Sequence, residues 1–184
     1  MQTYSHFLIT TVVNRLVKKQ AVIPVYSRQF LAGSVAPDMP LLVLTVAFTV
    51  DRRLKKSDQV WCGDEFNALF FSDPRWIISH QLLHAPFLLL LLLVVGGWLG
   101  SLRGQAVGWK LLWFALGCAF HTAIDLGTHH DDGPLVFFPF DWKTRLHSPV
   151  SYWDARHGAK IFAPVEHAVD ASLLVHLGNQ KSPR

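Results

Sequence analysis

Four residues that bind metal ions well lie within ten consecutive positions of the chain: His121, Asp125, His129 and His130. His121 and Asp125 are four residues apart, so on a helix both side chains leave the same face and can hold one cation. Gly127 can end this helix, in which case His129 or His130 returns over the same ion from the following loop. A lone buried histidine is usually a satisfied core residue, and a lone intramembrane aspartate often relays protons. Four such residues together favour a metal site.

A second pair with helical spacing, His80 and His84, precedes a long apolar run. Alone, such a pair is often a surface accident. His84 lies 20 residues before the turn residue Gly104, and His121 lies 17 residues after it. At ~1.5 Å of rise per residue, the two side chains differ in height by only about 4 to 5 Å if the segments form a hairpin. His80 and Asp125 form the next level pair, so both segments present ligands at one end.

Two apolar segments must form this hairpin. The first, from Ala85 to Leu102, has 18 residues without a charge, which is long enough for a membrane-spanning helix. The second runs from Ala106 to Leu126 and carries the His121 and Asp125 pair. A short turn at Arg103 and Gly104 separates them, which predicts an antiparallel helical hairpin with the first segment as the best transmembrane candidate.

The remaining chain also favours helices. We expect a first helix from about His6 to Lys19, a short helix beginning near Leu41, and a last helix that starts after Pro164 and ends near Leu177. Only Leu135 to Phe138, inside a loop spanning 131–153, has the pattern of a strand. The sequence therefore predicts an all-α, membrane-associated helical bundle.

Residues 51–76 are mixed and charged and are expected to lie outside any bilayer. Two interpretations of their aromatic and aliphatic residues stay open. These side chains either lie on a lipid surface or pack beneath a loop; they are Phe66, Leu69, Phe70 and Phe71.

Composition limits the class of protein. The chain has 184 residues with no abrupt change in composition, so we expect a single domain over 1–184. Hydrophobic residues make up 51% and charged residues 16%, which lies between a soluble domain and a pure membrane bundle. The net charge of +4 is dispersed along the chain, which suits anionic lipid headgroups better than a nucleic-acid partner. The N-terminus lacks the order of charges of a cleavable signal.

Four stretches of the chain together resemble a bacterial family of membrane-bound metal-dependent hydrolases and, more distantly, the zinc-dependent phospholipase C fold. In chain order these stretches are SHFLITT, LAGSVAPDMP, SHQLLHAPF and GCAFHTAIDLGTHHDDG. Their order and spacing match over roughly residues 5 to 140. The resemblance implies a location in the bacterial inner (plasma) membrane.

The resemblance also implies a set of metal ligands, with His84 and His130 as competing or additional members and Glu166 as the least secure. Without the resemblance, Asp38 is explained as a turn residue and Glu166 as a favourable charge at a helix N-terminus. The implied metal is divalent, most simply zinc, with more than one ion. Soluble relatives of this kind also use an N-terminal amine as a ligand, which Met1 is not expected to supply. The implied ligands are His6, Asp38, His80, His121, Asp125 and His129.

Two functions of different classes are compatible with these residues. The first is a metal-dependent hydrolase that acts at the membrane on a small-molecule or lipid substrate, such as a phosphoester, through a metal-activated water. The second is a membrane metal-binding or ion-transport protein in which the same side chains bind a cation without hydrolysis. An open coordination position for water distinguishes the first from the second.

Overall fold

The computed structural model describes residues 1–55 and 63–179. Within these ranges the chain forms eight α-helices, short 3-10 and π turns, and no strand. The α-helices are α1 (Thr3–Gln20), α2 (Ser27–Gly33), α3 (Met39–Leu54), α4 (Asp64–Ser72), α5 (Pro74–Gln81), α6 (Pro86–Gly97), α7 (Ala106–Thr128) and α8 (Ala159–Asn179). The shorter turns are η1 (Ala36–Asp38), η2 (Trp98–Leu102) and η3 (Ala155–His157). The predicted all-α class is confirmed.

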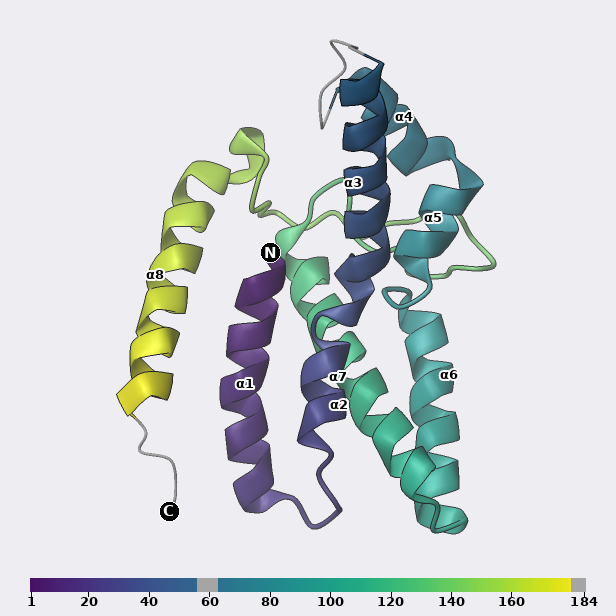
Figure 1. Cartoon of the computed structure of the whole chain (residues 1–184), viewed down its shortest axis with the longest axis vertical. Coiled ribbons are helices and arrows are strands. Elements are labelled where there is room, and N and C mark those ends of the chain that lie inside the picture. Colours follow the sequence, from purple (N-terminus) through teal and green to yellow (C-terminus); the bar gives the residue numbers. More distant parts are fainter. Residues whose placement is uncertain (56–62, 180–184) are drawn as a thin grey trace.

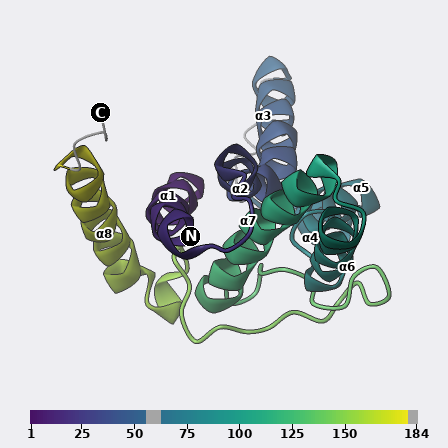
Figure 2. The same ribbon diagram turned by 90° about the horizontal axis from the view of Figure 1, so that it is seen from below.

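Helix α7 lies at the centre of the molecule, with α1 and α2 on one side and α6 on the other (Figures 1 and 2). Helices α6 and α7 pack antiparallel, as predicted from the short turn between the two apolar segments. Helix α8 lies beside α1 at the edge of the bundle, while α3, α4 and α5 form the other end. The N-terminus lies beside the C-terminal end of α7 (Figure 1), and Thr3 contacts Asp38 of η1.

Glycines let α2 approach α7 very closely. A Cβ at Gly33 would lie 2.2 Å from the Phe114 carbonyl oxygen, and one at Gly117 would lie 2.2 Å from the Phe30 carbonyl oxygen. Both distances are far below an ordinary van der Waals contact, so neither position accepts a larger residue without displacing a helix. This contact fixes the end of α2, and therefore Ser34, against the middle of α7.

Among the helices of residues 1–55 and 63–179, one, α7, is long and apolar enough by itself to cross a membrane. Two bent pairs pass the same test together, Ser27–Gly33 with Ala36–Leu54 and Pro74–Gln81 with Pro86–Leu102, which gives up to three spans. The uncharged run from Ala85 to Leu102 thus counts as a span only with α5, because α6 has 12 residues before η2 begins.

Helix α1 has the opposite burial pattern to a helix on the surface of a water-soluble protein. All four of its buried residues are polar, namely Ser5, His6, Thr10 and Asn14. None of its apolar side chains is buried, and Tyr4, Phe7 and Leu16 are 41–54% exposed. A lipid-facing exterior around a polar interior accounts for this arrangement, because apolar side chains gain nothing from burial when the solvent is lipid.

The aromatic residues of α4 pack inside the structure. Phe66 and Phe70 are buried with Phe48 of α3 and Trp76 of α5 in one cluster, whose rings meet edge to face. Packing, not a lipid surface, is therefore the correct interpretation for these two residues, while Phe71 is 44% exposed. Residues 56–62 of the predicted excursion lie outside the described residues.

The last helix begins earlier than predicted. Helix α8 starts at Ala159 and contains Pro164, because Gly158 adopts a positive φ of 85° and redirects the chain after η3. The predicted strand is reduced to a single antiparallel bridge between Leu135 and Arg145. The long loop after α7 otherwise crosses the end of the bundle as irregular backbone (Figure 2).

Candidate metal centre

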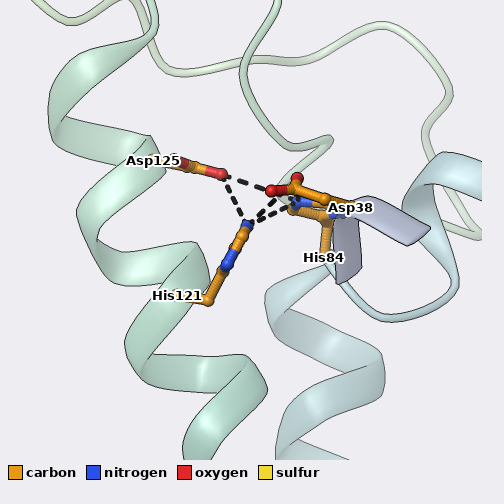
Figure 3. Close-up of side chains that lie close together, drawn as sticks. All are labelled: Asp38, His84, His121 and Asp125. Atoms are coloured by element: carbon orange, nitrogen blue, oxygen red, sulfur yellow. Dashed lines mark hydrogen bonds and ion pairs between the residues drawn. The ribbon is translucent and has the colours of Figure 1, made fainter. Parts of the chain in front are cut away.

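Four side chains converge beside the C-terminal half of α7: Asp38, His84, His121 and Asp125 (Figure 3). Each offers one ligand atom, and these four atoms all lie within 4.8 Å of one another. His84, His121 and Asp125 are buried, and Asp38 is partly exposed. The group joins three parts of the chain that are distant in sequence.

Local structure explains how each of these residues is positioned. His121 and Asp125 lie one turn apart on α7 and point the same way (Figure 3). His84 lies in the turn between α5 and α6, where Pro86 begins a new helix. Asp38 ends η1 immediately before α3, and its carboxylate accepts a hydrogen bond of 2.5 Å from the hydroxyl of Thr3 instead of capping the helix.

The ring nitrogens and carboxylate oxygens of the centre lie at distances expected for ligand atoms that face one common point. His121 Nε2 lies 3.0 Å from Asp125 Oδ2 and 3.4 Å from Asp38 Oδ1. His84 Nε2 lies 3.6 Å from each of the same two carboxylate oxygens. The two Nε2 atoms lie 3.2 Å apart, which confirms that the hairpin brings these histidines to the same level.

Hydrogen bonds from the outer ring nitrogens orient the rings of both histidines. His84 Nδ1 lies 2.8 Å from the backbone carbonyl oxygen of His80, and His121 Nδ1 lies 2.8 Å from that of Ser34. A carbonyl only accepts, so each Nδ1 carries the proton and donates it. The two Nε2 atoms then face each other and two carboxylates. A bound cation satisfies all four groups, and such outer hydrogen bonds are typical of metal-binding histidines.

A second group of donors faces the other oxygen of Asp125. Its Oδ1 lies 3.0 Å from His6 Nε2 and 3.4 Å from His129 Nε2. His6 is fully buried and stacks on His121 with ring centroids 3.8 Å apart, and its Nδ1 has no hydrogen-bond partner among the described residues. Buried polar atoms without partners are rare, so His6 fits a ligand role better than a structural one.

His129 and Asp132 form a charge pair just beyond the end of α7. His129 Nδ1 lies 2.9 Å from Asp132 Oδ2. Burial disfavours the charged imidazolium, but contacts with Asp125 and Asp132 outweigh it and raise the pKa of His129. Burial acts on Asp132 in the opposite direction, and its contact with His129 lowers the pKa of that carboxyl. This carboxylate orients the imidazole so that Nε2 faces Asp125.

The structure places the remaining predicted ligands outside the group of four. His80 is buried one turn before His84, and its Nδ1 lies 2.9 Å from the side-chain amide of Gln81. Glu166 is buried and accepts a hydrogen bond of 2.7 Å from the backbone of Gln2. His130 turns outward and lies with Asp131 and His147. A ligand role for these three residues stays a prediction.

Several participants were missed from the sequence. The nitrogen of Met1, which we did not expect at the site, lies 3.2 Å from His129 Nε2 and 3.3 Å from Asp125 Oδ1. Asp132 was also missed, although its position three residues after His129 was a usable signal. The Ser34 carbonyl had no signal, because any residue offers a backbone carbonyl.

A cavity of about 490 Å³ opens beside the centre. Asp38, Asp125, His129 and Asp132 line its polar end. Its opposite wall is apolar and is contributed by α3 and α4, including Leu41, Leu42, Phe66 and Phe70. Among the described residues, neither lysine nor arginine lines it. The cavity therefore presents metal-binding groups to one end of a ligand and an apolar surface to the other.

Comparison with known proteins agrees with a membrane location. No curated protein and no solved structure matches the chain. A protein family does match, described as YdjM inner membrane protein, and the match covers residues 1–181. This family is known as membrane-bound metal-dependent hydrolase. Given the apolar span α7 and the buried donor group beside it, the chain belongs to the YdjM family of inner membrane proteins.

Proposed function

We propose that this protein is a membrane-bound hydrolase that uses a divalent metal ion held by Asp38, His84, His121 and Asp125. The observation that carries the proposal is the convergence of two Nε2 atoms and two carboxylates, with each Nδ1 held by a backbone carbonyl. Two imidazoles and two carboxylates suit zinc. When bound, such an ion lowers the pKa of a coordinated water and offsets charge on a phosphoryl or acyl oxygen.

The contacts of the second carboxylate oxygen of Asp125 support a second ion. Its two carboxylate oxygens face different donors, with Oδ2 toward His121 and Oδ1 toward His6 and His129. A carboxylate in this position can bridge two cations. His6 Nε2, which lies 3.0 Å from that Oδ1, would then be a ligand atom.

The cavity supports an amphiphilic substrate, such as a lipid phosphoester. Its apolar wall on α3 and α4 suits an acyl or alkyl group, and a headgroup at its polar end would lie beside Asp38 and Asp125. Three carboxylates line the polar end, where neither lysine nor arginine is present among the described residues. A bound metal ion would therefore add positive charge that favours an anionic headgroup.

Metal content and turnover test this proposal separately. Purified protein in detergent should contain zinc or manganese near stoichiometric amounts, and His121→Ala and Asp125→Asn should lose most of it. The control His167→Ala, an exposed histidine on α8, should retain it. Wild-type metal content in His121→Ala would refute the centre.

Turnover is measured with a chromogenic phosphodiester and a panel of esters and lipid phosphoesters. We expect hydrolysis by the metal-loaded wild type and none by Asp125→Asn. If the wild type binds metal but hydrolyses nothing on the panel, the hydrolase assignment fails. Metal uptake by liposomes containing the protein would then support the transport function instead.

A further inference from the structure

A second group of metal-binding atoms lies in the loop after α7 and is separate from the buried centre. It consists of His130, Asp131 and His147, whose ligand atoms lie within 4.8 Å of one another. His130 Nε2 lies 3.5 Å from an Asp131 carboxylate oxygen, and the His147 ring lies beside the same oxygen. His147 Nδ1 donates a 3.0 Å hydrogen bond to the His130 carbonyl oxygen, which leaves its Nε2 to bind a cation. The side chains of Asp131 and His147 are 55% and 62% exposed, so this group is open to solvent.

The exposed group is held in place more firmly than a chance surface cluster. His130 Nδ1 donates a 2.6 Å hydrogen bond to the Ser148 carbonyl oxygen, which leaves Nε2 facing Asp131. The Ser148 hydroxyl donates to the Gly127 carbonyl oxygen at 2.7 Å, which ties the loop to the end of α7. The His157 ring stacks on His130 with centroids 3.5 Å apart. Such outer hydrogen bonds orient metal-binding histidines and favour one tautomer.

One extended stretch of backbone connects this group to the buried centre. His129 follows α7 with φ −121° and ψ 127°, a conformation in which successive side chains point to opposite sides. His129 therefore faces Asp125 inside, while His130 faces Asp131 outside. The two aspartates that follow also face different sides, because Asp131 contacts His130 and Asp132 contacts His129.

The cavities at the two groups share a wall. A smaller cavity of about 140 Å³ is lined by His130 and Asp131, and both Asp132 and Trp153 line this cavity and the large one. Asp132 Oδ2 contacts His129 and accepts a hydrogen bond from Trp153, while its buried Oδ1 has no partner among the described residues. A free carboxylate oxygen thus lies between the exposed group and the centre.

We propose that His130, Asp131 and His147 form a capture site for a divalent transition metal, which passes from there past Asp132 to the buried centre. Two imidazoles and one carboxylate select zinc, cobalt or nickel over magnesium or calcium. Three protein donors leave the remaining positions to water, so the ion exchanges readily. Capture is independent of the proposed function, whereas transfer rests on the proposed buried centre.

Capture is tested by titrating zinc-loaded, full-length protein in detergent with Co²⁺ and following the visible absorption of the bound ion. The wild type should bind one further ion, and His147→Ala should weaken this binding at least ~10-fold. His167→Ala removes an equally exposed histidine on α8 and should titrate like the wild type. Identical titrations of His147→Ala and wild type would overturn the capture site.

Transfer is tested by adding limiting zinc to metal-free protein and counting the ions that resist a brief treatment with a chelator. His147→Ala should fill the buried centre several-fold more slowly than wild type but reach the same final content. Equal rates would overturn transfer. A lower final content would also overturn the proposal, because His147 would then belong to the centre itself. Failure of the wild type to retain any ion points instead to failure of the proposed function.

Discussion

Replacing Gly117 by alanine should damage the metal centre without touching any ligand. The new Cβ would lie 2.2 Å from the Phe30 carbonyl oxygen, whereas ordinary contacts begin at 3.4 Å. Helix α2 must then move away from α7 by roughly 1 Å or deform. Ser34 follows directly after α2, so its carbonyl oxygen moves away from His121 Nδ1, to which it now lies at 2.8 Å.

The size of the effect follows from these contacts. A separation of roughly 1 Å takes the Ser34 contact well beyond the ~3.2 Å limit of a good N–H to oxygen hydrogen bond. Loss of such an outer partner typically lowers metal affinity ~10- to 100-fold. Overpacking should also lower the free energy of unfolding by about 1–3 kcal/mol. The Ser34 carbonyl belongs to the backbone, so no side-chain substitution at Ser34 removes this hydrogen bond, whereas displacement of α2 does.

The assay compares zinc affinity, measured by competition with a chelator, and thermal unfolding of Gly117→Ala with those of Gly127→Ala. Gly127 lies on the same helix, but a Cβ there meets nothing within 4 Å. Gly127→Ala should keep wild-type affinity and gain up to about 1 kcal/mol of stability. Wild-type zinc affinity in Gly117→Ala would refute the reasoning. So would an equal loss in Gly127→Ala, because the effect would not then come from the α2 contact.

Three further substitutions separate structural from functional roles. Thr10→Val should stabilise the protein by about 1–3 kcal/mol in thermal unfolding, because the buried Thr10 hydroxyl has no partner among the described residues; a loss of stability would show that this hydroxyl is needed. Gln81→Leu should destabilise the protein by a similar ~1–3 kcal/mol, because its buried amide contacts His80 and accepts from Leu135 N at 2.8 Å; unchanged unfolding would contradict this. His130→Ala should leave the metal content of the buried centre at equilibrium unchanged by elemental analysis, whereas a loss of that metal would place His130 within the centre.

Regular helices account for the parts of the site that the sequence predicts well. The pairing of His84 with His121 follows from counting residues to the turn at Gly104, since rise per residue is constant along a helix. Even though η2 is a π turn, the count places the two Nε2 atoms close enough to contact each other. Spacing of four residues likewise brings Asp125 onto the face of His121.

Tertiary contacts decide the parts that spacing does not determine. Asp38 reaches the centre because α2 packs on α7 through Gly33 and Gly117, a contact that no periodic pattern in either segment indicates. The sequence predicts that the last helix starts after Pro164, whereas Gly158 determines that α8 begins at Ala159. Both cases depend on backbone positions whose neighbours are distant in sequence.

The assignment of His129 and His130 shows why spacing alone left two alternatives. Continued as a helix, the chain would turn His130 about 100° from His129, and both rings would compete for one ion. The helix instead ends at Thr128 and the next residue is extended, so the two rings point to opposite sides. Sequence spacing predicts which residues share a face only within the bounds of a helix. Beyond it, a two-residue His-His motif can supply one ligand to each of two sites, which is the basis of the proposed capture and transfer of metal.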